Sequence, residues 1–206
     1  MIRLGLISLS LIFSALLSAQ ANFSGGIKGG FTASQVSGDG LAGFNKAGYC
    51  IGPFVKIAIS DQISISPEIL YITKGSRKPT NPDKGDFTSW GYIFHYVEVP
   101  VLLHYKFDRF TASGGLYVAA LTKGIEESQA GLQYPVANPE MKKTDIGFAI
   151  GGSVFFTDHL FLEVRYTQSV SPIRAAPDPL NVVPWYDGGM YNSVLQFILG
   201  YEFGKS

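Results

Sequence analysis

The chain has little charge, almost no cysteine and no long apolar run beyond its first residues. Charged residues make up 16% of its 206 residues, against about 25% in ordinary soluble domains. Much of the folded surface must therefore face something other than water. Cys50 is the single cysteine, which excludes an intrachain disulfide and predicts a small packed side chain. The 16 basic and 16 acidic residues balance, so charge gives no argument for nucleic-acid binding.

The N-terminal residues predict export. Arg3 supplies a positive charge, an apolar stretch with a few serines runs over residues 4–17, and Ala19-Gln20-Ala21 matches a small-x-small cleavage site. About fourteen residues are too few to cross about 30 Å of hydrocarbon as a helix. We expect residues 1–21 to be a signal peptide that is removed and residues 22–206 to form one domain.

The abundant feature is alternation with a period of two residues. In residues 191–203 the odd positions are nearly all large and apolar, whereas the even positions include Asn192, Gln196, Gly200 and Glu202. Such a segment is a β-strand with one apolar and one partly polar face. Eight segments alternate in this way. They are centred on residues 24–33, 47–59, 63–74, 92–107, 110–121, 144–156, 160–170 and 191–203.

The connections between these segments alternate in length. Residues 60–62, 108–109 and 157–159 are tight turns, and residues 34–46, 76–91, 122–143 and 171–190 are long loops. Short turns at the periplasm and long loops at the cell exterior are typical of bacterial outer-membrane barrels. The predicted fold is therefore all-β: an eight-stranded antiparallel up-and-down transmembrane β-barrel with short periplasmic turns and long extracellular loops.

The two faces of the predicted strands differ in chemistry. We assign the apolar face to lipid and the face with five bases and five acids to the lumen. Burying one such charge unpaired costs several kcal/mol, and eight strands leave an interior just wide enough for side chains. We predict a structural charge network rather than a wet pore. Its members are Lys28, Lys56, Glu68, Lys74, Glu98, Lys106, Asp145, Glu163, Arg165 and Glu202.

Aromatic residues and prolines add two further expectations. Aromatic girdles are expected at both membrane boundaries. One would hold Phe107, Phe110, Phe156, Tyr201 and Phe203, and the other Phe31, Tyr49, Tyr71, Tyr166 and Tyr191. Pro53, Pro67 and Pro100 each remove a ladder donor inside a predicted strand. We expect bulges or local register breaks at these three positions.

Several segments resemble a known family. They are residues 68–71 (EILY), 74–75 (KG), 96–105 (YVEVPVLLHY), 147–152 (GFAIGG) and 200–203 (GYEF), together with the opening residues 26–30 (GIKGG). In combination they are similar to the PorT-like outer-membrane β-barrel proteins of Gram-negative bacteria, over essentially the whole mature chain. The resemblance implies an eight-stranded barrel that the general barrel-assembly machinery inserts from the periplasm. Founding members are associated with secretion and gliding motility, which we do not transfer, and no catalytic residue carries over.

No catalytic or metal-binding pattern is visible in the sequence. His95, His104 and His159 have no ligand spacing. The glycines of residues 147–152 lie inside a strand and lack the Lys-Ser/Thr of a phosphate loop. Some outer-membrane barrels are enzymes, but the acidic residues near the external rim form no acid-base pair. We predict neither an enzyme nor a cofactor.

Three functional hypotheses remain open. The first is a structural or interaction barrel that contacts an envelope or surface protein through its loops, with outer-membrane lipid around it. The second is a small passive channel, and the third is a soluble lipocalin-like carrier of a hydrophobic ligand. The predicted loop contacts are Tyr134, Val182, Val183 and Trp185.

Overall fold

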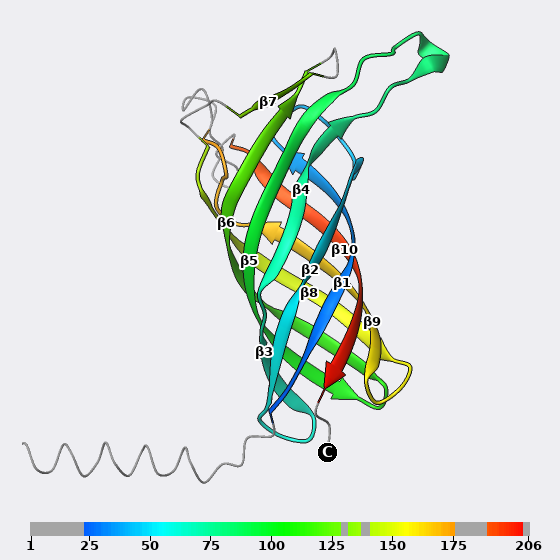
Figure 1. Ribbon diagram of the computed structural model, residues 1–206, viewed down its shortest axis with the longest axis vertical. Coiled ribbons are helices and arrows are strands. Elements are labelled where there is room, and N and C mark those ends of the chain that lie inside the picture. Colours follow the sequence, from blue (N-terminus) through cyan, green and yellow to red (C-terminus); the bar gives the residue numbers. More distant parts are fainter. Residues whose placement is uncertain (1–22, 129–131, 137–140, 176–188, 204–206) are drawn as a thin grey trace, which may run out of the picture.

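The computed structural model describes residues 23–128, 132–136, 141–175 and 189–203, so the predicted signal peptide lies outside the described residues (Figure 1). The elements are β1 (Phe23–Ser37), β2 (Lys46–Ala58), β3 (Ile63–Pro67), β4 (Leu70–Lys78), the 3-10 helix η1 (Pro82–Lys84), β5 (Trp90–Phe107), β6 (Phe110–Glu127), β7 (Gln133–Pro135), β8 (Thr144–Phe155), β9 (Leu160–Ser169) and β10 (Tyr191–Phe203). Among these residues, no helix has the length and apolar character needed to cross a membrane.

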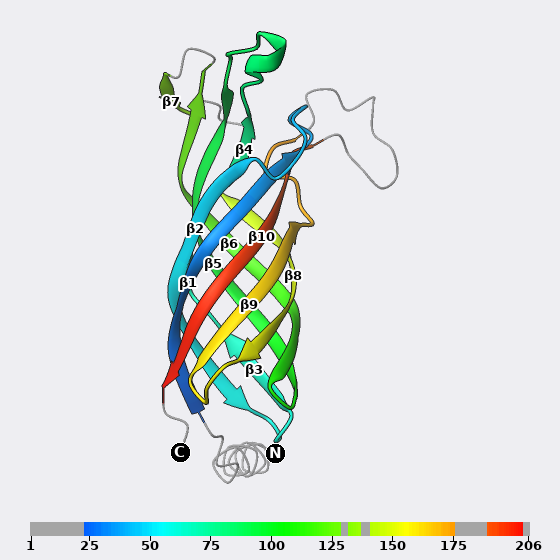
Figure 2. The same ribbon diagram turned by 90° about the vertical axis from the view of Figure 1, so that its right-hand side faces the viewer.

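The strands close into a ring of antiparallel neighbours. β1 pairs with both β2 and β10, and β3 and β4 together fill the single place between β2 and β5. β6, β8 and β9 complete the circle, while β7 pairs only with the end of β6. The ring therefore has eight strand positions, which confirms the predicted barrel. Figures 1 and 2 show the twisted cylinder. The first residue of β1 and the last residue of β10 lie at the end that carries the short turns.

Two predicted loops contain more β-structure than expected. β4, β5 and β6 continue past the barrel, so that the sheet rises on one side of the extracellular end (Figure 1). The β4–β5 connection is a long hairpin with η1 near its tip, and β7 extends the edge of β6. Among the described residues, the extracellular rim therefore rises highest over β4 to β7 (Figure 2).

The prolines interrupt the sheet without shifting it. Pro53 accepts a hydrogen bond from the Ile69 amide (3.1 Å), and Pro100 accepts one from the Glu68 amide (2.9 Å). Residues 68–69 separate β3 from β4. Because the N–H and C=O of a strand residue point to the same side, the nitrogen atoms of both prolines, which carry no hydrogen, face these two residues. The register against β5 is the same before and after the gap. The expectation of bulges or local register breaks at these prolines is therefore wrong, and the strand is interrupted at residues 68–69 instead.

A register shift does occur between β5 and β6, at His95/Tyr96. Tyr96 pairs with Leu121 and His95 with Lys123, so Thr122 is the extra residue of a β-bulge. The Thr122 hydroxyl donates to the His95 carbonyl (2.9 Å). Since side chains alternate along a strand, the extra residue turns Lys123 to the outer face, where it lies beside His95.

Burial follows the predicted faces. Even positions of β4, β5 and β10 are largely buried inside the barrel, and the odd positions of β5 from Val97 to Tyr105 are exposed. The residues assigned to lipid are exposed or half-buried in the described structure. They are Ile51, Val55, Ile57, Ile59, Ile63, Ile65, Ile69, Tyr71, Val97, Val99, Val101, Leu103, Tyr105, Leu116, Val118, Ile146, Phe148, Ile150, Leu160, Leu162, Val164, Tyr166, Leu195, Phe197 and Leu199.

Candidate functional site

The middle of the lumen holds a balanced group of charges that we call the Arg165 cluster: Lys28, Glu68, Glu163 and Arg165. Arg165 forms a fork with Glu68, with both guanidinium–carboxylate distances at 2.9 Å. It also donates to Glu163 through Nε (2.8 Å), and Lys28 bridges Glu68 (2.8 Å) and Glu163 (3.0 Å). All four carboxylate oxygens therefore have a cationic partner. Bidentate pairing of this kind fixes geometry as well as charge.

A second group lies nearer the extracellular end, and we call it the Lys74 cluster: Lys74, Glu98 and Asp145. Lys74 Nζ lies 2.5 Å from Glu98 and 3.1 Å from Asp145. Asp145 also accepts hydrogen bonds from the Ser169 hydroxyl (2.7 Å) and the Asn192 amide (3.0 Å). Neither Glu98 oxygen accepts a hydrogen bond from a described residue, so its contact with Lys74 is an ion pair alone. This cluster has one positive and two negative groups.

Glycines make room for the aromatic rings that cover these lysines. Three glycines face an aromatic residue directly across the sheet: Gly26 opposite Phe54, Gly200 opposite Phe161, and Gly147 opposite Tyr117. A methyl group at any of them would collide with the facing ring, at 2.6 Å or less. The rings then lie near the ammonium groups: Lys28 Nζ is 4.8 Å from the Phe54 centroid and Lys74 Nζ is 4.4 Å from that of Tyr117. Cation–π attraction strengthens when the partners are desolvated.

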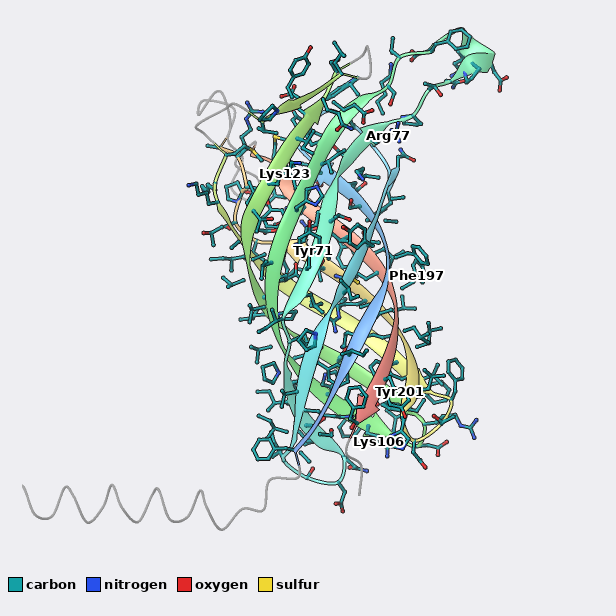
Figure 3. All side chains as sticks on the ribbon, in the orientation of Figure 1. Tyr71, Arg77, Lys106, Lys123, Phe197 and Tyr201 are labelled. Atoms are coloured by element: carbon teal, nitrogen blue, oxygen red, sulfur yellow. The ribbon has the colours of Figure 1, made fainter. Side chains whose placement is uncertain are left out.

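The periplasmic mouth is less tightly closed. Lys56 pairs with Glu202 at 3.3 Å, and the Ser24 hydroxyl donates to the same carboxylate (2.6 Å). A cavity of about 20 Å³ lies beside them, which is room for about one water molecule. Lys106 is a correction to the predicted network. It is exposed at this end (Figure 3) and makes no ion pair within the described part of the chain, because it lies at the end of β5 beside the 108–109 turn.

The extracellular end of the lumen contains a cluster of buried apolar side chains, which we call the apolar cap. Inward side chains of β5 continue from Tyr96 through Phe94 to Tyr92, and the rings of Tyr92 and Phe94 stack with their centroids 5.7 Å apart. Ile173 and Met190 come from the loop bases, where the Ile173 amide donates to the Met190 carbonyl (2.8 Å). Both are buried. The cap also contains Val36, Cys50, Ile72, Tyr117, Ala119, Val194 and Ile198.

The sequence reasoning missed this cap. The sequence did contain a pattern that indicates it. The even-numbered, inward residues of β5 are aromatic from Trp90 to Tyr96, whereas the next inward residue of the same strand, Glu98, is charged. The Arg165 cluster, the Lys74 cluster and the apolar cap thus follow one another from the middle of the lumen to its extracellular end. Charged and aromatic groups occupy the middle, and apolar groups occupy the outer mouth.

The rim carries exposed apolar side chains on structured elements. Phe87, 73% exposed, lies on the β4–β5 hairpin, and Tyr134 is exposed on β7. Lys78 joins the two sides of the hairpin, because its ammonium group contacts Asp86 (2.6 Å) and Thr88 (2.8 Å) on the returning segment. Hydrogen bonds from Lys78 and Thr88 hold the pKa of Asp86 well below its usual range. Val182, Val183 and Trp185 lie outside the described residues.

The polar residues considered for chemistry at the rim do not converge. Asp86 pairs with Lys78, Glu127 lies 3.9 Å from Arg77, and the His95 ring contacts Tyr71. In the described ranges, no group of three His, Cys, Asp or Glu side chains is arranged to hold a metal ion.

The comparisons with known proteins agree with this architecture. The family of outer membrane protein beta-barrel domains matches residues 18–174. The chain belongs to this family. Its location is therefore the outer membrane, which removes the water-soluble carrier from the three hypotheses. The comparison with curated proteins finds no match.

Two solved structures share the fold at low identity. The Yersinia pestis attachment invasion locus protein Ail, in complex with the heparin analogue sucrose octasulfate, is 13% identical and has a TM-score of 0.50. That match covers 88% of this chain and 99% of Ail. Neisserial surface protein A is 10% identical with a TM-score of 0.51, and the match covers 89% of this chain and 98% of that protein. At these identities the likeness shows the fold alone.

Proposed function

We propose that the protein is an outer-membrane barrel that acts as a structural or interaction protein through its extracellular rim. The observation that carries the proposal is the combination of a filled lumen with a raised, structured rim. A conduit needs a continuous polar path, whereas buried side chains of two ion clusters and of the apolar cap occupy the described lumen of this barrel. What remains available to a partner is the surface above the membrane.

The raised hairpin is the part of the rim best suited to contact another protein. Its tip is ordered by backbone hydrogen bonds between Asn81 and Asp86 (2.7 and 3.0 Å), yet it presents Phe87 to solvent. An exposed large apolar side chain on a rigid projection loses little conformational freedom on binding. We infer an envelope or surface protein as the partner, which corresponds to the first hypothesis.

The finer family assignment and the route of export are also proposals. The quoted segments support a place among the PorT-like barrels within the wider family. The N-terminal pattern supports cleavage of residues 1–21 and insertion by the barrel-assembly machinery. Mass spectrometry of the protein purified from outer membranes tests cleavage directly, because the mature chain should begin at Asn22.

Shortening the hairpin tests the interaction role. Lys78 and Trp90 are paired in register, so residues 79–89 can be replaced by Asn-Gly, which forms a two-residue hairpin turn. The shortened barrel should still insert and keep its gel-mobility shift on heating. A partner that crosslinks to the wild type in native membranes and is identified by mass spectrometry should be lost.

A pair of matched substitutions refines the test. Phe87→Ser removes the exposed ring at the extracellular tip, and Phe156→Ser removes an exposed ring at the periplasmic turn. Only the first should weaken crosslinking. Undiminished crosslinking after shortening of this hairpin and of the other three loops would contradict the proposal. A steady, reproducible conductance of the purified protein in planar bilayers would favour the passive channel instead.

A further inference from the structure

A polar and aromatic cluster lies on the outer face of the barrel at the upper limit of its apolar belt. Going up β5 from the periplasmic end, the outward residues are Phe107, Tyr105, Leu103, Val101, Val99 and Val97, and His95 is the first polar one. Ten residues separate Tyr105 from His95, which is about 33 Å along a strand and about 25 Å of height at the usual tilt. This matches the height of the lipid-facing band. His95 therefore lies at the level of the outer-leaflet headgroups.

Tyr71 contacts the His95 ring, and Tyr49 lies beside Tyr71. Tyr71 Oη is 2.7 Å from His95 Nδ1, and the two rings are 5.9 Å apart. The Tyr49 ring lies 5.9 Å from that of Tyr71 and extends the row onto β2. When Tyr71 donates to Nδ1, a neutral His95 carries its hydrogen on Nε2. A protonated ring also has a hydrogen there, and Nε2 makes no hydrogen bond to another described residue.

Positive charge gathers around this imidazole. The β6 bulge places Lys123 outward as the direct cross-strand neighbour of His95, where it is exposed and forms no ion pair within the described ranges. The charge of Lys123 acts directly on the His95 ring. Arg77 lies higher on β4, above the level of Tyr71 (Figure 3). Its nearest carboxylate, on Glu127, is 3.9 Å away.

We propose that Lys123 and His95, framed by Tyr49 and Tyr71, form a binding site for a phosphate group on a lipid headgroup of the outer leaflet. Lysine ammonium groups and an imidazole N–H are donors suited to a phosphate. The exposed apolar residues directly below, Val97 and Val99, suit the acyl chains of the same lipid. A free phosphate would use only the upper part of this surface. The site is independent of the partner proposed for the hairpin.

Native mass spectrometry of the purified barrel tests this site, with bisphosphorylated lipid A as the probe and dephosphorylated lipid A as the comparison. Lys123→Gln and the double variant Lys123→Gln/His95→Gln remove donors from an exposed surface. Lys106→Gln is the matched control, because Lys106 is an exposed lysine at the opposite end of the neighbouring strand. Retained mobility shift on heating shows that each variant is folded.

The wild type should bind the bisphosphorylated lipid at least about tenfold more tightly than the dephosphorylated one, as expected from one or two charge-assisted hydrogen bonds. Lys123→Gln should remove most of that preference, and Lys106→Gln should leave it within about twofold. Added salt should weaken it, because exposed charges are screened over about 8 Å at physiological ionic strength. Equal binding of both lipids, equal effects of the two lysine substitutions, or displacement by millimolar inorganic phosphate alone would overturn the proposal.

Discussion

The Arg165 cluster and the Lys74 cluster lie in the same lumen and differ in how completely their charges are matched. In the first, two cations meet two carboxylates and every carboxylate oxygen has a partner. In the second, one lysine faces two acids, of which Asp145 has further donors and Glu98 has none among the described residues. Both are fully buried. Burial alone therefore does not describe the energetics of a lumen charge.

This contrast identifies the buried charges on which the stability of the barrel depends most. A buried ion is costly unless its partners replace the water it has lost. The Arg165 cluster meets this condition with a bidentate fork and a bridging lysine. Glu98 meets it only through one ammonium group that it shares with Asp145. Removing a member of the first cluster should thus be expensive, whereas neutralising Glu98 should not.

The largest effect is expected for Arg165→Met. This change leaves Glu68 and Glu163 buried with Lys28 as their single shared cation. Breaking a buried ion pair in this way costs about 3–5 kcal/mol of unfolding free energy. Urea titration of the barrel folded into lipid vesicles measures the loss. Arg109→Met, at an exposed periplasmic turn, is the control and should change stability by less than about 0.5 kcal/mol. Similar losses in both variants would end the comparison.

The sharpest contrast is between Glu68→Gln and Glu98→Gln. Both replace a buried carboxylate by an amide of nearly the same shape. Glu68→Gln replaces one acceptor oxygen of the Arg165 fork by an NH2 group that cannot accept and leaves excess positive charge, so it should cost about 2–4 kcal/mol. Glu98→Gln makes the Lys74 cluster neutral and should cost less than about 1 kcal/mol.

The same urea titration ranks these two variants. A cost for Glu98→Gln as large as that for Glu68→Gln would show that completeness of pairing does not separate the clusters. The double variant Lys74→Met/Glu98→Gln adds a second check. It should be more stable than Lys74→Met alone, because it leaves one acid without a cation instead of two.

A smaller effect is expected at the periplasmic mouth. The Lys56 side chain is 21% exposed and pairs with Glu202, which also accepts the Ser24 hydroxyl. Water reaches this pair, so Lys56→Met should cost about 1 kcal/mol, which is between surface and buried pairs. Raising the salt concentration should reduce the difference from wild type. Arg165→Met should show no such salt dependence, since its partners are shielded from solvent.

The smallest effect concerns the exposed Lys78–Asp86 pair of the hairpin. The pKa of the Asp86 carboxyl is lowered by hydrogen bonds from Lys78 and Thr88. A carboxyl group with a lowered pKa stabilises the folded hairpin fully above its unfolded pKa of about 3.9. That stabilisation is lost as the pH falls through the lower pKa of the folded state. The protection of the amides of residues 79–88 against hydrogen exchange, relative to unprotected amides at the same pH, should therefore fall only in acid. Asp86→Asn should lower this protection already at pH 7. Global unfolding should remain unchanged in both cases.

The strands and their faces were predictable because alternation is a local property. The segment predicted at 191–203 coincides with β10, and the alternation around Val99 assigned its outward face correctly. Features that depend on neighbouring strands were not predictable. The Thr122 bulge, the unshifted register beside Pro100 and the exposure of Lys106 each depend on how β5 meets its partners and where the barrel ends.

Local alternation was enough to assign most side chains to the lumen or to the lipid, since a period of two sets each side chain to one side of a strand. The tertiary structure decided which of them meet. Arg165 and Glu68 are 97 residues apart in the chain, and only the tilt and closure of the barrel bring them within hydrogen-bonding distance. The same closure places Ile173 and Met190 over the outer mouth and gathers Lys123, His95 and Tyr71 from three strands at one level of the outer face.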